Sequence, residues 1–339
     1  MILLLNCIPE IRGWSPIQHM IDLAAGLLGA EVVRVGPGAA SFANRALALL
    51  SGRRRGAGGR DFGLLICAGP SDLRKAFGIS NWRSRFGFLS AWVIDSFWVD
   101  HIPTSVTRAQ PFDHIFVTSL EDIEQWKSQL GVPVSWLPWG SDVLNLGAWS
   151  GQRPWDVTRV GRQPKEWDDD SISSAAAAEA GLKFRGRPPS DGLNVLENHK
   201  YLMRVYSASK YLLAFSNLAN REAWTHPVRD YVTGRWVDAL ACGSVVAGIP
   251  PRGLSATELL WPEATLDLKT VERKEGLRIL ADAISGWTEA VPYHNYSMAL
   301  QKLDWRWRFE HIARTFGIAP APLVEELARL RGQVQIMSA

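Results

Sequence analysis

The chain has 339 residues, enough for two domains of ordinary size, each with its own core. An apolar fraction of 47% and a charged fraction of 21% are typical of globular proteins, and no apolar run approaches the roughly 20 residues of a membrane-spanning helix. A net charge of +3 is too small to indicate binding to nucleic acid. The three cysteines are widely separated in apolar stretches, which predicts reduced core residues rather than a disulfide framework or a zinc site.

The N-terminal half alternates short apolar runs with longer amphipathic segments, a rhythm that predicts a parallel sheet flanked by helices. The expected strands are Ile2–Cys7, Glu31–Val35, Phe62–Cys67, Ala91–Ile94, His114–Val117 and Val134–Leu137. The first apolar run lacks the basic residues that precede it in a signal peptide, so we expect a cytoplasmic protein. Ser15, as N-cap, and Pro16 then begin a helix that extends to Leu28.

Loops with polar or glycine residues follow the first and fourth of these strands. Ligands commonly bind beyond the carboxyl ends of the strands in such a sheet. Gly13 and Trp14 after the first strand, and Asp95 and His101 after the fourth, are therefore candidate contacts for a ligand. An ordinary surface loop explains His101 equally well.

A group of basic residues lies close together in the sequence, between positions 53 and 85. They are Arg53, Arg54, Arg55, Arg60, Arg74, Lys75, Arg83 and Arg85. Such a group fits either a solvated loop, which we favour, or a patch that binds an anionic membrane surface, so peripheral contact with a membrane is left open. The 16 tryptophans are several times the usual share, and indole rings that are not in the core stack well on sugars.

A segment rich in Gly, Ser, Pro and Trp separates the two halves of the chain. The expected strands that follow are Asp156–Val160, Leu182–Phe184, Tyr211–Phe215 and Ser244–Ile249; the expected helices are Asp170–Ala180, Asn198–Ser207, Lys274–Trp287 and Tyr296–Phe316, and a charged amphipathic tail follows at Leu323–Gly332. The second half thus repeats the first, and we predict two α/β domains that meet at a cleft. The predicted boundaries are 1–145, a linker at 146–155, 156–300, and a C-terminal helix and tail at 301–339.

Two carboxylates lie eight residues apart in the segment from Asp230 to Gly243. Apolar residues surround Asp238 in a short helix, so we expect this side chain to be buried, and a buried carboxylate needs hydrogen-bond donors. Hydroxyl groups of a ligand or backbone amides would meet that need. The alternative is an ion pair between Asp238 and Arg235, three residues earlier on the same helix face.

Further charged residues lie at predicted strand ends. Gly161 and Arg162, with Lys165 nearby, place two cations where a diphosphate could bind. The triplet 168–170 matches the Asp-x-Asp pattern of metal-dependent nucleotide-sugar enzymes, but it directly precedes a helix, where carboxylates act as caps, and we favour capping. No phosphate-binding P-loop or Gly-x-Ser-x-Gly turn supports an ATPase or a hydrolase.

These motifs together resemble those of GT-B glycosyltransferases of the glycosyl transferases group 1 type, related to the bacterial GT4 enzymes, and the resemblance covers the whole chain. They are Val160-Gly161-Arg162 with Lys165, Phe184-Arg185-Gly186, the segment from Asp230 to Gly243, Leu137 to Asp142, and Asp304-Trp305 with Arg306 and Arg308. The segment from Asp230 to Gly243 is similar to the family's Glu-x7-Glu signature, with aspartate in place of both glutamates. The resemblance implies two Rossmann-like doubly wound domains and a C-terminal helix that crosses back to the first domain.

The resemblance also implies roles for individual residues. Asp238 would accept hydrogen bonds from the ribose of a nucleoside-diphosphate sugar, and Asp230 would face the transferred sugar. Arg162 and Lys165 would stabilise the leaving diphosphate. The other implied donor contacts are Gly161, Gly186, Tyr231, Val232, Thr233 and Arg235.

The expected activity is that of a retaining glycosyltransferase of bacterial glycan or glycoconjugate synthesis, with no metal or cofactor. Its acceptor is a glycan, a lipid-linked molecule or a small molecule, bound by the first domain, and its oligomeric state is open. One alternative is a non-catalytic GT-B-like protein that binds a sugar or a partner. The other is a metal-dependent GT-A enzyme that uses Asp168 and Asp170.

Overall fold

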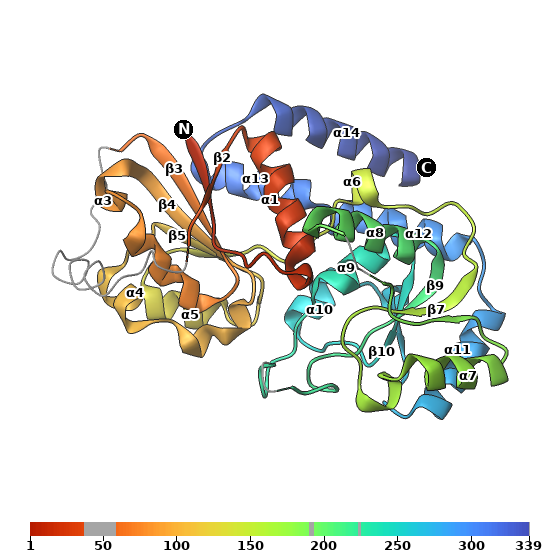
Figure 1. Ribbon diagram of the computed structural model, residues 1–339. Helices are drawn as coiled ribbons and strands as arrows, with labels where there is room; N and C mark the ends of the chain where they lie inside the picture. The colour runs from red at the N-terminus through yellow and green to blue at the C-terminus, as the bar shows by residue number, and fades with distance from the viewer. Residues whose placement is uncertain (37–58, 190–192, 223–224, 339) are drawn as a thin grey trace. The chain divides into compact units, whose positions relative to one another are not determined.

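The computed structural model describes residues 1–36, 59–189, 193–222 and 225–338, and Figure 1 shows its ribbon. Within these residues the chain forms two units. The first contains residues 1–138 and 308–327, and the second contains residues 139–307 and the C-terminal residues from 328 onward. Each unit is built around a parallel β-sheet.

The first unit contains a six-stranded sheet in the order β2-β1-β3-β4-β5-β6, and each neighbouring pair is parallel. The strands are β1 (Ile2–Asn6), β2 (Glu31–Arg34), β3 (Asp61–Cys67), β4 (Phe86–Val93), β5 (His114–Val117) and β6 (Val134–Trp136). The helices are α1 (Ser15–Leu28), α3 (Trp82–Arg85), α4 (Thr104–Ala109) and α5 (Ile123–Leu130), with 3-10 turns at Arg12–Trp14, Pro70–Gly78 and Ser96–His101. The predicted strands are confirmed, although β4 begins five residues earlier than expected. Ser15 is the first residue of α1 rather than its N-cap, which is Trp14.

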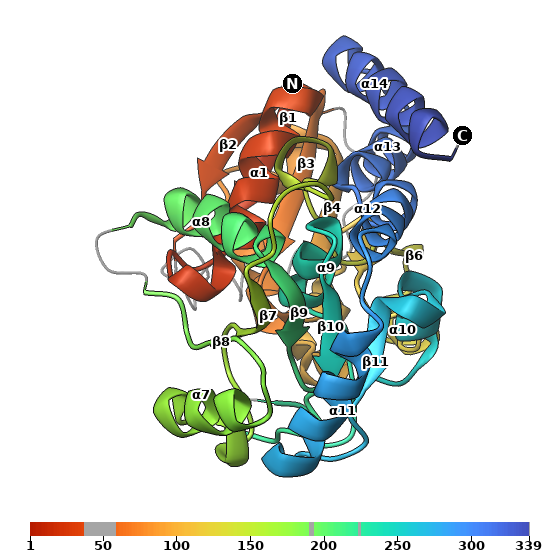
Figure 2. The same cartoon turned by 90° about the vertical axis from the view of Figure 1, so that its right-hand side faces the viewer.

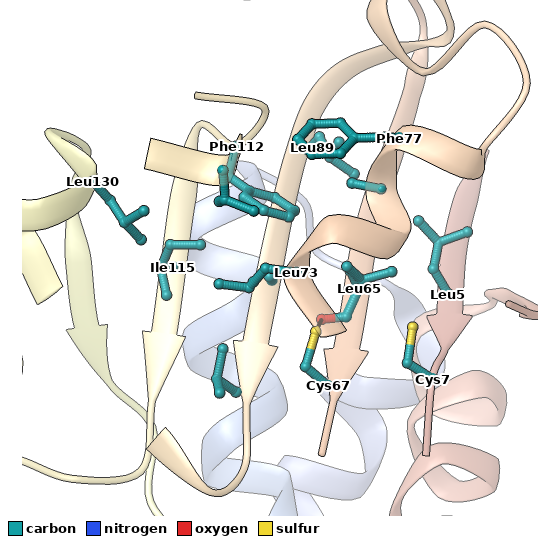
Figure 3. Close-up of a cluster of buried hydrophobic side chains, with 14 of the residues drawn as sticks. Leu5, Cys7, Leu65, Cys67, Leu73, Phe77, Leu89, Phe112, Ile115 and Leu130 are labelled. Carbon is teal, nitrogen blue, oxygen red and sulfur yellow. Dashed lines mark hydrogen bonds between the residues drawn. The ribbon is translucent and has the colours of Figure 1, made fainter. Parts of the chain in front are cut away.

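One face of this sheet carries a hydrophobic core of the first unit (Figure 3). Side chains such as Leu5, Leu65 and Ile115 point from the strands toward Leu73 and Phe77 of the long 3-10 turn. The cysteines are free and buried, as predicted: Cys7 and Cys67 lie in this core, and Cys242 lies in the second unit. The strands have helices or turns on both faces, which explains their nearly continuous apolar runs.

The C-terminal part of the chain contributes to the first unit. Helix α13 (Trp305–Phe316) enters it at Arg308, and the ring of Phe316 stacks on that of Phe62 with centroids 5.3 Å apart. His311 of the same helix meets Phe116 of β5 edge to face. The predicted return of a C-terminal helix to the first domain is therefore confirmed.

The second unit contains a five-stranded sheet in the order β11-β10-β9-β7-β8, again parallel throughout. The strands are β7 (Trp155–Arg159), β8 (Phe184–Arg185), β9 (Ser209–Leu213), β10 (Val245–Gly248) and β11 (Thr265–Asp267). The helices are α6 (Val143–Leu146), α7 (Asp170–Glu179), α8 (Val195–Ser207), α9 (Gly234–Ala241), α10 (Leu254–Leu259), α11 (Arg273–Ser285), α12 (Ala290–Lys302) and α14 (Ala321–Ser338, which begins in the first unit), with 3-10 turns at Lys165–Trp167 and Pro262–Ala264. The four predicted strands are found within two residues of their expected ends, and the predicted helices that correspond to α7, α8 and α11 within three. Strand β11 and helices α6 and α10 were not predicted.

Helices cover both faces of this second sheet (Figure 2). Alternate residues of the central strands, among them Val157 and Leu213, pack with Ala177 of α7 and Leu277 of α11. On the opposite face, α9 packs against α8, α12 and β10. All residues of α9 except Arg235 are buried, which explains its apolar sequence.

The prediction of one helix from Tyr296 to Phe316 is wrong, because the chain breaks between α12 and α13. Asp304 lies at the break and accepts a hydrogen bond from the backbone N–H of Arg306 at 2.9 Å. The backbone of Ser141 pairs with the same stretch, receiving the N–H of Trp305 at 3.0 Å and donating to Leu303 at 2.9 Å. These bonds replace intrahelical ones, so tertiary contacts override a helical pattern here. Among the described helices, none is both long and apolar enough to cross a membrane.

A capping box begins α8, where the Asn194 side chain accepts from the Glu197 backbone and the Glu197 carboxylate accepts from the Asn194 backbone. We expect Asn194→Ala to lower the free energy of unfolding by about 1 kcal/mol, because the backbone N–H of Glu197 loses its acceptor. Urea unfolding followed by tryptophan fluorescence measures this change. Lys200→Ala, at an exposed position of the same helix, should change it by less than about 0.5 kcal/mol. Equal values for the two variants would contradict the capping role.

Candidate functional site

The candidate site lies at the carboxyl edge of the second sheet. Strands β7, β9 and β10 end there, and the loops after them carry Arg162, Asn217 and Arg252. Hydrogen bonds join these loops to one another and to the segment that leads into α9. In parallel α/β sheets this edge is where ligands bind.

Gly161 and Arg162 form the turn directly after β7. Gly161 has φ +73°, and a Cβ atom there would lie 3.3 Å from Nη1 of Arg235, so both the backbone conformation and the space favour glycine. The half-buried Arg162 donates from Nη2 to the side-chain oxygen of Asn217 at 2.8 Å. Its Nε is buried and has no hydrogen-bond partner among the described residues. The guanidinium therefore keeps one unsatisfied donor.

Arg235 lies against the same turn. Its Nη1 donates to the carbonyl oxygen of Arg162 at 2.8 Å and to that of Val160 at 3.4 Å. Burial, and then the nearby charge of Arg162, lower the pKa of Arg235 to about 10. The alternative in which Arg235 pairs with Asp238 is wrong, because the guanidinium bonds to these carbonyls while Asp238 has other partners.

The two arginines and the N-terminus of α9 form a group that we call the cationic edge, defined by Arg162, Arg235 and Thr233. Thr233 is the N-cap of α9, yet its side chain makes no capping bond and its buried hydroxyl has no partner among the described residues. Neither arginine forms an ion pair within the part of the chain that the structure describes. The first amides of a helix carry partial positive charge, so the cationic edge favours an anion.

Asp230 lies in the loop before α9, half-buried, as part of a hydrogen-bonded group. Its carboxylate accepts from the backbone N–H of Arg252 at 3.1 Å and of Tyr231 at 3.2 Å. The hydroxyl of Ser216 and the backbone N–H of Asn217 also donate to it. Burial raises the pKa of Asp230, and these four donors lower it again. The carboxylate is thus fixed between the loops that follow β9 and β10.

Asp238 lies in the second turn of α9 and is only 2% exposed. One carboxylate oxygen accepts from the Ser141 hydroxyl at 2.6 Å, and the other is 3.8 Å from Nδ1 of His199. Burial raises the pKa of Asp238 to about 7. The structure therefore places the two aspartates in separate groups, Asp230 with Ser216 and Asp238 with Ser141.

The other residues expected around the donor have varied surroundings. Val232 is buried, Tyr231 is half-buried, and Lys165 is exposed in a 3-10 turn, without an ion pair among the described residues. At Gly186 a Cβ atom would lie 2.6 Å from the carboxyl carbon of Asp170, so this glycine allows the chain to approach that carboxylate closely.

The aspartate triplet has structural partners. Asp169 caps α7 by accepting from the backbone of Ser171 and Ile172, which confirms the predicted capping. Asp168 and Asp170 both bind Arg159, which is buried at the end of β7. Among the described residues, no group of three or more possible ligands could hold a metal ion.

Candidate residues of the first unit lie after β1 and β4. Gly13 and Trp14 belong to a 3-10 turn, and His101 is exposed and stacks on Trp98 with ring centroids 4.7 Å apart. Asp95 is half-buried, has no side-chain partner among the described residues, and has a pKa that burial raises to about 7.

The predicted basic patch is only partly described. Arg53, Arg54 and Arg55 lie outside the described residues, as does the side chain of Arg83. Arg60 and Arg74 are exposed. Two other cations are neutralised locally, since Lys75 pairs with Asp72 at 2.9 Å and Arg85 with Asp61 at 3.3 Å. These pairs weaken the case for a membrane-binding patch.

Several residues of the site were not predicted from the sequence. Asn217 and Ser216 follow β9 directly, and their polarity at a strand end was a signal that could have identified them. Arg252 contributes a backbone N–H, and Ser141 lies nearly a hundred residues from its partner, so neither had a local signal.

No family model matches the chain, and no curated protein is similar to it in sequence. The chain is similar in fold to many solved structures. HepE from Anabaena, in complex with UDP and glucose, has a TM-score of 0.54 and 14% identity, and the match covers 93% of this chain and 99% of that one. A trehalose-6-phosphate synthase from E. coli, bound with UDP-2-fluoro glucose, has a TM-score of 0.54 and 12% identity, with 94% and 100% covered. The chain has the GT-B fold of glycosyltransferases, with two Rossmann-like domains.

Proposed function

We propose that this protein is a glycosyltransferase that binds the diphosphate of a nucleoside-diphosphate sugar at the cationic edge. The observation that carries the proposal is that Arg162 and Arg235 lie together beside a helix N-terminus, with no neutralising carboxylate among the residues that the structure describes. Two adjacent cations repel each other, so their proximity is costly unless an anion binds there. The unsatisfied Nε of Arg162 and hydroxyl of Thr233 are donors for phosphate oxygens.

The same groups suit the chemistry of glycosyl transfer. The bond between the anomeric carbon and the diphosphate oxygen breaks, and its electron pair stays on the diphosphate. Arg162, Lys165 and the amides of 232–233 stabilise the negative charge that builds there. Asp230 faces the transferred sugar, whose anomeric carbon becomes positively charged as the bond breaks. The acceptor hydroxyl forms the new bond and passes its proton to an oxygen of the departing diphosphate, with retention of anomeric configuration.

The first unit supplies the acceptor contacts in this proposal, from Gly13, Trp14, Asp95 and His101. Asp95 is the strongest of these candidates, because a desolvated carboxylate without a protein partner can accept a hydrogen bond from a hydroxyl group. The acceptor is a glycan, a lipid-linked molecule or a small molecule that offers such a hydroxyl.

A thermal-shift screen tests the proposal. The HepE and trehalose-6-phosphate synthase structures each hold a ligand that contains UDP, so UDP-sugars come first, followed by GDP-, ADP-, CMP- and dTDP-sugars. We expect the nucleotide sugars of one base to raise the melting temperature of the protein in a concentration-dependent way, because a ligand that binds only the folded state stabilises that state. The absence of a shift with the whole panel would contradict the proposal.

Removal of metal ions should leave activity unchanged. The residues that the metal-dependent alternative requires are already engaged, Asp168 and Asp170 with Arg159. We expect the rate of nucleotide release in EDTA to stay within about twofold of the untreated rate, since cations of the protein stabilise the leaving group. A loss of activity that Mg²⁺ or Mn²⁺ restores would favour the metal-dependent alternative.

A non-catalytic protein that binds a nucleotide sugar is the second candidate. The observation that favours it is the surroundings of Asp230, whose carboxylate already accepts from Arg252, Tyr231, Ser216 and Asn217. Donor binding without transfer or hydrolysis, across a broad set of acceptors, would support this candidate over the enzyme.

A further inference from the structure

Asp238 has a partner that the sequence does not indicate. The Ser141 hydroxyl donates to it at 2.6 Å, and both residues are buried, Ser141 completely. His199 of α8 faces the second carboxylate oxygen. Both oxygens of the carboxylate thus face protein groups inside the second unit.

Ser141 belongs to a stretch that is itself firmly held. Its backbone pairs with Leu303 and Trp305, and the next residue, Asp142, forms a buried ion pair with Arg306 at 3.0 Å. Arg306 also binds Asp304 at 3.0 Å. A side chain that forms a hydrogen bond to this stretch is therefore held in a fixed position.

Helix α9 connects Asp238 rigidly to the cationic edge. Asp238 is five residues from Thr233, or roughly 7.5 Å along the helix. A helix moves as a rigid rod, so a shift at Asp238 moves the N-terminal amides and Arg235 with it. The other end is also held, because Arg153 donates to the carbonyl of Cys242 at 2.7 Å.

We propose that Ser141 and Asp238 form a positioning pair that holds the N-terminus of α9 where it binds the donor diphosphate. This inference rests on the proposed function. It assigns Asp238 an indirect role, in contrast to the direct contact with the ribose that the sequence resemblance implies. Direct contact and positioning predict different results for the Ser141 variant.

The test measures the affinity of each variant for UDP, 2′-deoxy-UDP and 3′-deoxy-UDP by calorimetry well below the melting temperature. If the screen identifies another base, its diphosphate and deoxy analogues replace these. The variants are Ser141→Ala, Asp238→Ala, Asp238→Asn and the double alanine variant. Ser285→Ala is the matched control, since this exposed serine bonds only within the last turn of α11.

Positioning predicts that Ser141→Ala and Asp238→Ala each weaken UDP binding roughly tenfold, the effect of one hydrogen bond to a charged group. The double variant should be no weaker than either single variant, because both remove the same bond. Asparagine keeps an acceptor for Ser141, so Asp238→Asn should stay within about threefold of the wild type. The ratio of UDP to deoxy-UDP affinity should not change in any variant.

Two results would overturn the proposal. One is a ratio of UDP affinity to deoxy-UDP affinity that falls in Asp238→Ala but not in Ser141→Ala. This result would show that Asp238 binds the ribose directly. The other is a lower melting temperature with unchanged affinity, which would make the pair merely structural. Should Asp238→Ala not fold, Ser141→Ala and Asp238→Asn decide the question. A wild-type protein that binds no nucleotide contradicts the proposed function instead.

Discussion

Replacing Arg162 with alanine is expected to weaken the binding of the nucleotide-sugar donor by roughly 100-fold or more. Truncating one partner of a buried, hydrogen-bonded charge pair costs about 2–5 kcal/mol, and each tenfold loss of affinity corresponds to about 1.4 kcal/mol. Within the described part of the chain, Arg162 has an unsatisfied Nε and Asn217 as its side-chain partner, so its removal leaves the protein core intact. Calorimetric titration of the donor that the screen identifies measures the loss.

Arg278→Ala is the matched control for this experiment. Arg278 is an exposed arginine of the same unit and pairs with Glu275 and Asp282 on α11. Its removal changes the net charge equally but should leave donor affinity within about twofold, because surface ion pairs contribute little. The circular dichroism spectra and melting temperatures of both variants should match the wild type. Unchanged donor affinity in Arg162→Ala would rule out the cationic edge as the diphosphate site.

Asp230→Asn is expected to lower turnover roughly 100- to 1000-fold while donor affinity changes by less than about fivefold. The carboxylate is proposed to stabilise positive charge at the anomeric carbon, and this charge is much greater in the transition state than in the bound donor. The asparagine side chain has nearly the same shape as the aspartate carboxylate but carries no charge. Nucleoside diphosphate released per second at saturating donor, compared with donor affinity, separates the two effects.

Asp156→Asn is the control, because Asp156 is also a half-buried carboxylate that accepts a backbone N–H, from Lys183, and it also pairs with Lys210. It lies toward the amino end of β7, away from the carboxyl edge of the sheet. Turnover in this variant should stay close to that of the wild type. If Asp230→Asn reduced affinity and turnover equally, Asp230 would act through the loops it joins rather than on the sugar.

The strands of both sheets, except the short edge strand β11, were predictable because their signal is local. Parallel strands with helices on both faces are buried on both sides, so they appear as short apolar runs bounded by turns. Helix α7 is a similar case, since Asp169 caps it through atoms two and three residues away. The end of α9 followed equally from Gly243, which has φ +76°.

Long-range contacts explain the predictions that were wrong. The spacing of Arg235 and Asp238 is that of an ion pair on a helix, but Arg235 bonds to carbonyls at the end of β7, and Asp238 bonds to Ser141. The break between α12 and α13 likewise depends on Ser141, which lies more than 160 residues earlier. No window of sequence contains both partners of such a contact.

The sequence by itself determined the two α/β units, the positions of most of their strands and the loops in which Gly161, Arg162 and Asp230 lie, because hydrophobic periodicity and turn residues act over a few positions. Only the tertiary structure decided which charges meet: Arg162 and Arg235 lie together without a carboxylate, and the two aspartates belong to separate groups. The physical reason is that a buried polar group needs a hydrogen-bond partner, and the packing of the fold decides which partner lies close enough. That partner can lie anywhere in the chain.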